Sequence, residues 1–188
     1  RRVLFRSTIT TLGSGSLAIG GAISGAFNLS KAGSGTLALT GAIGTGAGNV
    51  NVNAGSLTLG GANTYSGGTT VNAGQLNINN ASALGTGALT IAGASNAILD
   101  NTSGAAIVST RVNAQNWNSN FTFAGTNNLN MGTGAVTINS DRTITTLGSG
   151  SLAIGGAISG AFNLSKAGSG TLALTGAIGT GAGNRSEE

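Results

Sequence analysis

The feature that most constrains the fold is a short motif, apolar–any–apolar, set between small residues and glycine. In four successive copies the first apolar residues are Leu17, Leu37, Leu57 and Leu76, spaced by 20, 20 and 19 residues. A period of two is typical of strands that bury one face. The Gly, Asn and Ser clusters between the motifs favour turns, and no window holds the 3.6-residue period of an amphipathic helix. We therefore predict an all-β chain.

The near-constant spacing predicts a β-solenoid in which each coil takes roughly 20 residues. Successive coils would stack about 4.8 Å apart, with the apolar residues aligned in columns inside. Roughly nine coils would fit residues 8–184, giving a rod about 40 Å long. The alternative is a β-sandwich, which also has alternating strands at short intervals. The regular return of the glycine-bounded motif favours the solenoid.

Composition excludes several classes of function. The 188 residues contain no His and no Cys, so catalytic triads, imidazole metal sites, thiol nucleophiles and disulfides are excluded. Charged residues make up only 6%. Six of them lie in residues 8–184, and they form no basic stripe of the kind that binds nucleic acid. These six residues are Lys31, Asp100, Arg111, Asp141, Arg142 and Lys166.

One 42-residue segment occurs twice without a substitution, as residues 8–49 and residues 143–184. Codons can be chosen for residues 4–7 whose reverse complement encodes residues 185–188, and that DNA resembles a common sequencing adapter. We therefore expect residues 1–7 and 185–188 to be non-native tails that flank a single repeat region, residues 8–184. The duplication has two interpretations, an overlap created during sequence assembly or a genuine duplication within a repeat protein.

Residues 55–91 carry a more specific pattern. The segment NTYSGGT at residues 63–69 lies between two strand motifs, and ALGTG follows at residues 83–87. This arrangement resembles the passenger-associated repeat of bacterial autotransporters, and weaker half-motifs occur at residues 33–41 and 168–176. The resemblance implies a right-handed parallel β-helix in a secreted, surface-displayed passenger. It also implies an N-terminal signal and a C-terminal outer-membrane barrel outside this sequence, so that the chain would be an internal fragment.

Two groups of residues are candidates for a site. Asp100 and Asp141 are the only carboxylates of residues 8–184, and a glycoside-cleaving pair needs two within about 10 Å. Together with Arg111 in a groove they would indicate a polysaccharide-active enzyme, but solvated turn residues are the favoured interpretation. Trp117 and Tyr65 could stack on a glycan as part of a carbohydrate-binding module, although packing is favoured for Trp117 and a structural role for Tyr65. The Gly-rich turns lack the carboxylates of a calcium site and the lysine of a phosphate loop, so we expect neither metal nor cofactor.

The sequence thus predicts a structural stalk segment of an autotransporter passenger, not an enzyme, with adhesion as a role of the whole protein. Its partners would be the adjacent passenger coils, the outer-membrane barrel, and a surface glycan or cell receptor. The location would be the bacterial cell surface. Because a solenoid cut at both ends exposes unpaired strand edges, we expect the isolated fragment to self-associate.

Overall fold

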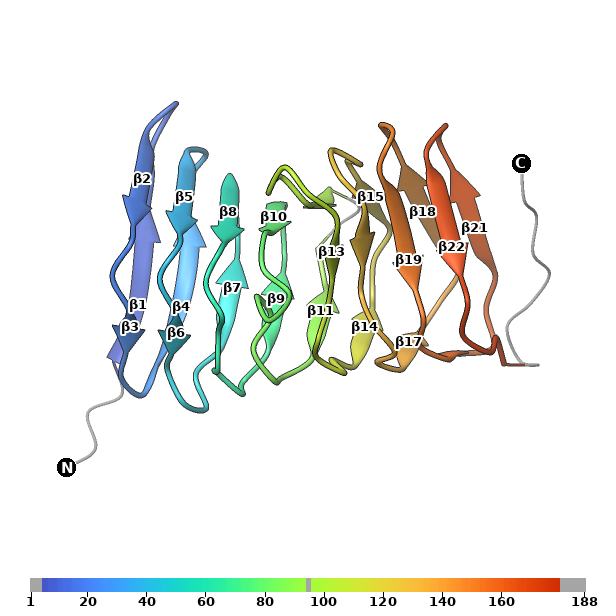
Figure 1. Cartoon of the computed structure of the whole chain (residues 1–188), viewed down its shortest axis with the longest axis horizontal. Helices are drawn as coiled ribbons and strands as arrows, with labels where there is room; N and C mark the ends of the chain where they lie inside the picture. The colour runs from blue at the N-terminus through green and yellow to red at the C-terminus, as the bar shows by residue number, and fades with distance from the viewer. Residues whose placement is uncertain (1–4, 94–95, 180–188) are drawn as a thin grey trace.

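The computed structural model describes residues 5–93 and 96–179, with side chains from residue 8 onward. These residues form strands and turns, and they contain no helix. Figure 1 shows the coils standing side by side in one row, with the two ends of the chain at opposite ends of the row. The architecture is a β-solenoid, and the predicted all-β fold class is confirmed.

Two eight-stranded parallel sheets form two sides of the coil. The first sheet consists of β1 (Phe5–Thr10), β4 (Phe27–Ala32), β7 (Val50–Val52), β9 (Thr69–Val71), β11 (Leu89–Ile91), β14 (Gln115–Trp117), β17 (Val136–Ile138) and β20 (Ile158–Ser159). The second sheet consists of β2 (Ser16–Ile19), β5 (Thr36–Leu39), β8 (Ser56–Leu59), β10 (Gly74–Ile78), β12 (Ala97–Asp100), β15 (Phe121–Phe123), β18 (Arg142–Thr146) and β21 (Leu164–Ala167).

The third side of the coil is less regular. Two short sheets take this position, one near each end of the rod: β3 (Ile23–Ser24) with β6 (Ile43–Gly44), and β13 (Ile107–Val108), β16 (Leu129–Asn130), β19 (Ser151–Ile154) and β22 (Thr171–Leu174). Between these two short sheets the third side has no strand, yet backbone hydrogen bonds still join its coils. Thr64 N–H donates to the Ile43 carbonyl (2.9 Å), and Thr86 N–H donates to the Tyr65 carbonyl (2.9 Å).

The predicted leucine column is confirmed. Leu17 pairs with Leu37, Leu37 with Leu57, and Leu57 with Leu76, and Leu99 continues the column. Leu37, Leu57 and Leu76 are fully buried, as are the inward residues of the first sheet, such as Val52 and Val71. The apolar residues thus form one core that runs along the inside of the solenoid.

The structure has fewer coils than predicted and excludes the β-sandwich alternative. Each long sheet has eight strands, so the described residues form about eight coils and not nine. Every pair among the described strands is parallel, whereas a β-sandwich is built from antiparallel strands. Coil length also varies more than expected, because Val52 pairs with Val71 across 19 residues and Ile91 pairs with Trp117 across 26.

Equivalent residues of the two identical segments lie on different sides of the rod. Residues 8–10 belong to β1 in the first sheet, but their duplicates, residues 143–145, belong to β18 in the second sheet. The pairing inside each copy is nevertheless the same: Leu17 pairs with Leu37, and Leu152 pairs with Leu172. The block therefore carries its own internal register, and its position around the coil is shifted by one side.

Glycine is required where coils approach closely at a corner. Gly55 has a φ of 66°, and a Cβ atom there would lie 2.3 Å from the Gly35 carbonyl oxygen. Gly74, one coil further, has a φ of 82°, and its Cβ would lie 2.3 Å from the Gly55 oxygen. A side chain would be strained by the backbone conformation and would collide with the preceding coil. These stacked positions confirm glycine as a corner residue.

Candidate functional site

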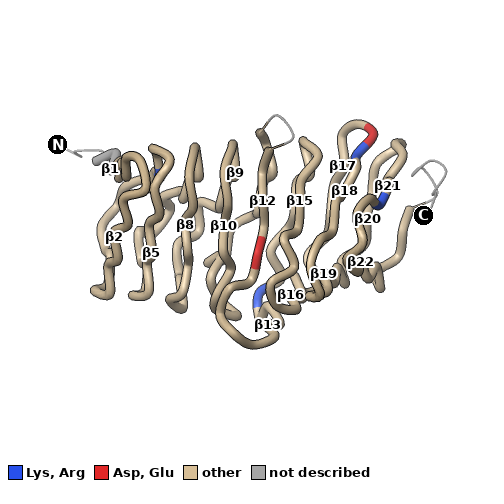
Figure 2. The backbone as a smooth tube through the Cα atoms, turned by 90° about the horizontal axis from the view of Figure 1, so that it is seen from above, with Lys and Arg blue, Asp and Glu red and all other residues tan. Residues whose placement is uncertain are grey.

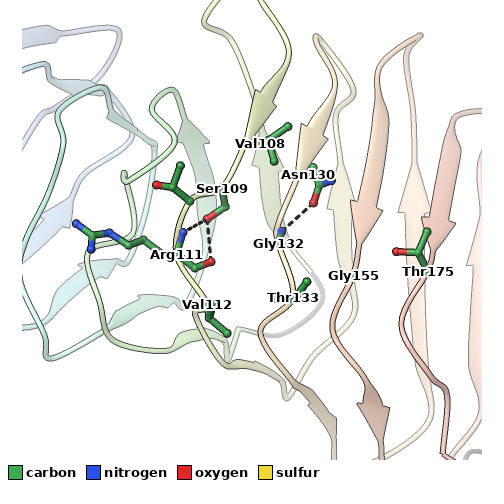
Figure 3. A pocket seen from close by; sticks show the side chains of 10 residues that line it. Val108, Ser109, Arg111, Val112, Asn130, Gly132, Thr133, Gly155 and Thr175 are labelled. Atoms are coloured by element: carbon green, nitrogen blue, oxygen red, sulfur yellow. Dashed lines mark hydrogen bonds between the residues drawn. The ribbon is translucent and has the colours of Figure 1, made fainter.

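A depression lies on the third side of the coil (Figure 3). It has a volume of about 330 Å³ and lies where the longest coil bulges outward around β13. Val108 and Val112 are exposed on 60% and 74% of their surface. The remaining lining residues are Ser109, Thr110, Arg111, Asn130, Gly132, Thr133, Gly155 and Thr175.

Polar side chains that line this depression form hydrogen bonds with nearby backbone groups. Ser109 Oγ donates to the Arg111 carbonyl and accepts from the Arg111 N–H, both at 3.3 Å, and Asn130 Oδ1 accepts from Gly132 N–H at 2.8 Å. The Arg111 side chain points away from the depression, over the neighbouring coil (Figure 3). No carboxylate or thiol lines the depression, and no cluster of three potential metal ligands occurs among the described residues.

The structure separates the two carboxylates that the sequence allowed as a pair. Asp100 follows Leu99, which is level with Phe123 and Thr146 in the second sheet. Asp100 is therefore level with Leu147, the residue after Thr146. Asp141 precedes β18 and lies six residues before Leu147, about 20 Å away at the rise of an extended chain. This separation is about twice the distance over which two carboxylates act on one glycosidic bond. Figure 2 shows the two red segments at different corners.

Each carboxylate stabilises its own turn. Asp100 is buried; its Oδ1 accepts from Thr126 N–H at 3.0 Å, and its Oδ2 accepts from Thr126 Oγ1 at 2.6 Å. Asp141 is exposed, and its Oδ1 accepts from Asn163 N–H at 2.8 Å. That hydrogen bond, with a second from the Asn163 amide, lowers the pKa of Asp141. Both side chains thus join one coil to the next.

Trp117 lies in the core. Its side chain is 0% exposed, it stands in the inward column between Ile91 and Ile138, and its ring meets that of Phe121 edge-on with centroids 5.3 Å apart. Trp117 Nε1 donates to Gln115 Oε1 at 3.3 Å. The alternation of strand β14 accounts for this position, because Trp117 and Gln115 both face inward. A glycan contact would require the ring to leave the core.

Tyr65 and Asn63 bind coils together from inside. Asn63 Oδ1 accepts from Ile43 N–H (2.8 Å) and Nδ2 donates to the Ala83 carbonyl (2.6 Å), so one amide joins three coils. The Tyr65 hydroxyl shares a hydrogen bond with Thr69 Oγ1 at 2.6 Å. Both side chains are fully buried. The segment at residues 63–69 is therefore a structural clamp, and sequence reasoning missed the role of Asn63 although it lies in the recognised motif.

A second residue missed by sequence reasoning is Lys31, which is 1% exposed. Its ammonium donates to the carbonyls of Ala32 (2.8 Å), Gly33 (2.6 Å) and Ala54 (3.0 Å), the last from the next coil. Burial lowers the pKa of Lys31. Strand alternation could have revealed its orientation, since Lys31 shares the inward side of β4 with Leu29. Three backbone carbonyls satisfy the charge, and this lysine caps a corner.

Alkaline pH is expected to unfold the chain through Tyr65. Burial raises the pKa of its hydroxyl far above the ordinary 10.0. Above pH 10 the unfolded state therefore loses a proton that the folded state retains, and the free energy of unfolding should fall by up to about 1.4 kcal/mol per pH unit. Urea titrations at several pH values would measure this slope.

The matched control is Tyr65→Phe, which keeps the ring and removes the ionisable group. Above pH 10 the free energy of unfolding of the variant should fall less steeply, because its unfolded state has no tyrosine hydroxyl at position 65 to ionise. Any effect of Lys31 is the same in both proteins and cancels when their slopes are subtracted. Equal slopes for the two proteins would contradict the burial of this hydroxyl.

The sequence model of the passenger-associated-transport-repeat family matches residues 29–58, 52–78 and 164–183. The first two matches run together from β4 to the end of β10, and the third covers β21 and β22. Neither curated proteins nor solved structures gave a match. Within the described residues, no helix is long and apolar enough to span a membrane.

The matches coincide with the architecture found above. The first begins in the first sheet at β4, whereas the third, which is identical to residues 29–48 of the first, begins in the second sheet at β21. The repeat is therefore a unit of coil stacking that is not tied to one side of the rod. The resemblance inferred from residues 63–69 is confirmed: the chain carries passenger-associated-transport repeats, which indicate an autotransporter passenger domain and a secreted or surface-exposed protein.

Proposed function

We propose that the chain is a structural stalk segment of a passenger anchored in the outer membrane through a C-terminal barrel. The observation that carries this proposal is the continuity of the core. Fully buried apolar residues line the inside of successive coils from Leu37 to Leu152, and the coils lie in a single row (Figure 1). Eight coils at about 4.8 Å span about 34 Å, so the segment would space a distal element from the cell.

The same geometry supports assembly outside the cell. Each coil contacts mainly its two neighbours, so folding can proceed coil by coil as the chain emerges. The sequence has no Cys, so no disulfide could lock the chain before export. The partners of this segment are the adjacent passenger coils, which would cover its two ends, and adhesion to a glycan or receptor is proposed as a property of the whole protein.

Surface display tests the proposal. The chain would be placed between a signal peptide and an outer-membrane barrel, with an epitope tag at its N-terminus, in a Gram-negative host. We expect antibody to label the tag on intact cells, and protease added outside to leave the solenoid as a resistant fragment. A Gly/Ser linker of equal length is the control and should be digested completely. A tag that remains periplasmic, or a chain digested as fast as the linker, would refute the stalk role.

A further inference from the structure

Among the described residues, the two ends of the rod carry apolar residues that no further coil covers. In the described part of the chain, β1 and β2 end the long sheets on one side, and β20 and β21 end them on the other. Leu17 in β2 is 41% exposed. Six further apolar residues near the ends are partly buried: Ile9, Ile19, Ile23, Leu172, Leu174 and Ile178.

The duplicated segment gives the exposure of the same residues when a further coil covers them. Leu152 is the duplicate of Leu17 and is 0% exposed, because β16 packs against its strand. Leu37 is the duplicate of Leu172 and is also 0% exposed, because β8 covers it. Each end of the rod therefore presents a strand whose duplicate is covered in the interior, by β16 in one case and by β8 in the other.

We propose that the C-terminal coil of one chain stacks on the N-terminal coil of a second copy, head to tail, and so continues the solenoid. This proposal rests on the proposed stalk role, in which coil stacking continues beyond both ends of the segment; in the isolated segment a second copy takes that place. All described strand pairs are parallel, and only contact between unlike ends continues that arrangement. Contact between two like ends would be related by a two-fold axis and would pair the strands antiparallel.

The pairing inside the duplicated segment supplies the register that we assume for the contact, with the order of the two strands reversed: inside a copy the SLAI strand comes before the TLAL strand, whereas across the contact β22 comes before β2. In each copy the SLAI strand pairs with the TLAL strand residue by residue. Stacking in the same phase brings β22 of one chain against β2 of the next, with Leu172 level with Leu17 and Leu174 level with Ile19. Ile178 then meets Ile23, as Ile158 meets Ile178 within the chain. Apolar residues meet apolar residues at each of these positions.

Complementary blocking of the two ends tests the contact. Leu17→Lys places a charge on the N-terminal end and Leu172→Lys places one on the C-terminal end; both sites are partly exposed, so folding should survive and is checked by circular dichroism. In sedimentation velocity we expect the unmodified chain to form concentration-dependent oligomers and each variant alone to remain monomeric. An equimolar mixture should give a discrete dimer, because one free end of each kind remains. Dimers of either variant alone would overturn the head-to-tail contact.

Cysteine crosslinking tests the register, since the chain has no native Cys. Ala18 and Ala173 alternate with the inward leucines and lie at opposite ends of the rod. A disulfide in A18C/A173C can therefore form only between chains, and neighbouring strands are close enough for it. We expect a ladder of multimers on a non-reducing gel. A18C/A38C joins paired residues and should close within one chain, whereas A38C/A173C, one coil further in, should stay uncrosslinked.

Two results would refute the stacking. Ala173 is the duplicate of Ala38, and Ala38 pairs with Thr58. Crosslinking in T58C/A173C would therefore mean that residues 143–184 of one chain take the place of residues 8–49 in another chain. A monomer at all concentrations, with no ladder in A18C/A173C, would exclude the contact altogether. If that monomer is still displayed on the cell surface, the stacking fails while the stalk role stands.

Discussion

Trp117→Ala is expected to lower the free energy of unfolding by about 3–5 kcal/mol, the usual cost of removing a large buried aromatic ring. The ring is 0% exposed and fills the inward column of the first sheet next to Phe121. Neighbouring coils are fixed by backbone ladders on both sides, at β11 and β17, so they cannot collapse into the space. Urea unfolding followed by far-ultraviolet circular dichroism would measure the change, since the variant lacks the only Trp.

Two variants control this experiment. Trp117→Phe keeps a ring in the column and should lose clearly less stability than the alanine variant. Val112→Ala removes two methyl groups from a side chain that is 74% exposed and should change the free energy of unfolding by less than about 0.5 kcal/mol. If Trp117→Ala matched Val112→Ala, the ring would not be part of the core, and a surface role in glycan binding would regain support.

The columns of the core were predictable because they depend on local alternation alone. Leu17, Leu37, Leu57 and Leu76 differ by nearly one coil length, so their alignment followed from spacing. The orientation of Trp117 was harder to predict. Alternation places Gln115 and Trp117 on the same side of β14, but a polar and an aromatic residue together do not show which side faces inward. Packing against Phe121 and the hydrogen bond to Gln115 decide it.

The side of the rod on which a strand lies could not be predicted from local sequence. The duplicated segment settles this point, because identical residues occupy β2 in the second sheet and β19 on the third side. The offset between the copies equals six coils and one further side, and it accumulates from coils of 19 to 26 residues between them. A motif such as SLAI fits any side, since each side requires only alternating apolar residues and a glycine corner.

The same duplication also allows one substitution to be tested in two environments. Gly21 and Gly156 are the same residue of the two copies, and neither has a φ in the left-handed region. A Cβ at Gly21 would have no heavy atom within 4 Å, because Gly21 lies in the first coil. A Cβ at Gly156 would lie 1.8 Å from the Gly134 carbonyl oxygen of the preceding coil. Only the second position requires glycine for space.

Gly156→Ala should therefore lower the free energy of unfolding by about 2–3 kcal/mol, because the backbones of two coils must move apart. Gly21→Ala should change it by less than about 0.5 kcal/mol. Local sequence is the same around both positions, so helix or strand propensity cannot explain a difference between them. Urea unfolding of both variants, followed by circular dichroism, gives the comparison. Equal losses of stability would mean that coil stacking does not determine whether alanine is tolerated at this corner. A large difference would show that contact with the preceding coil makes the glycine necessary.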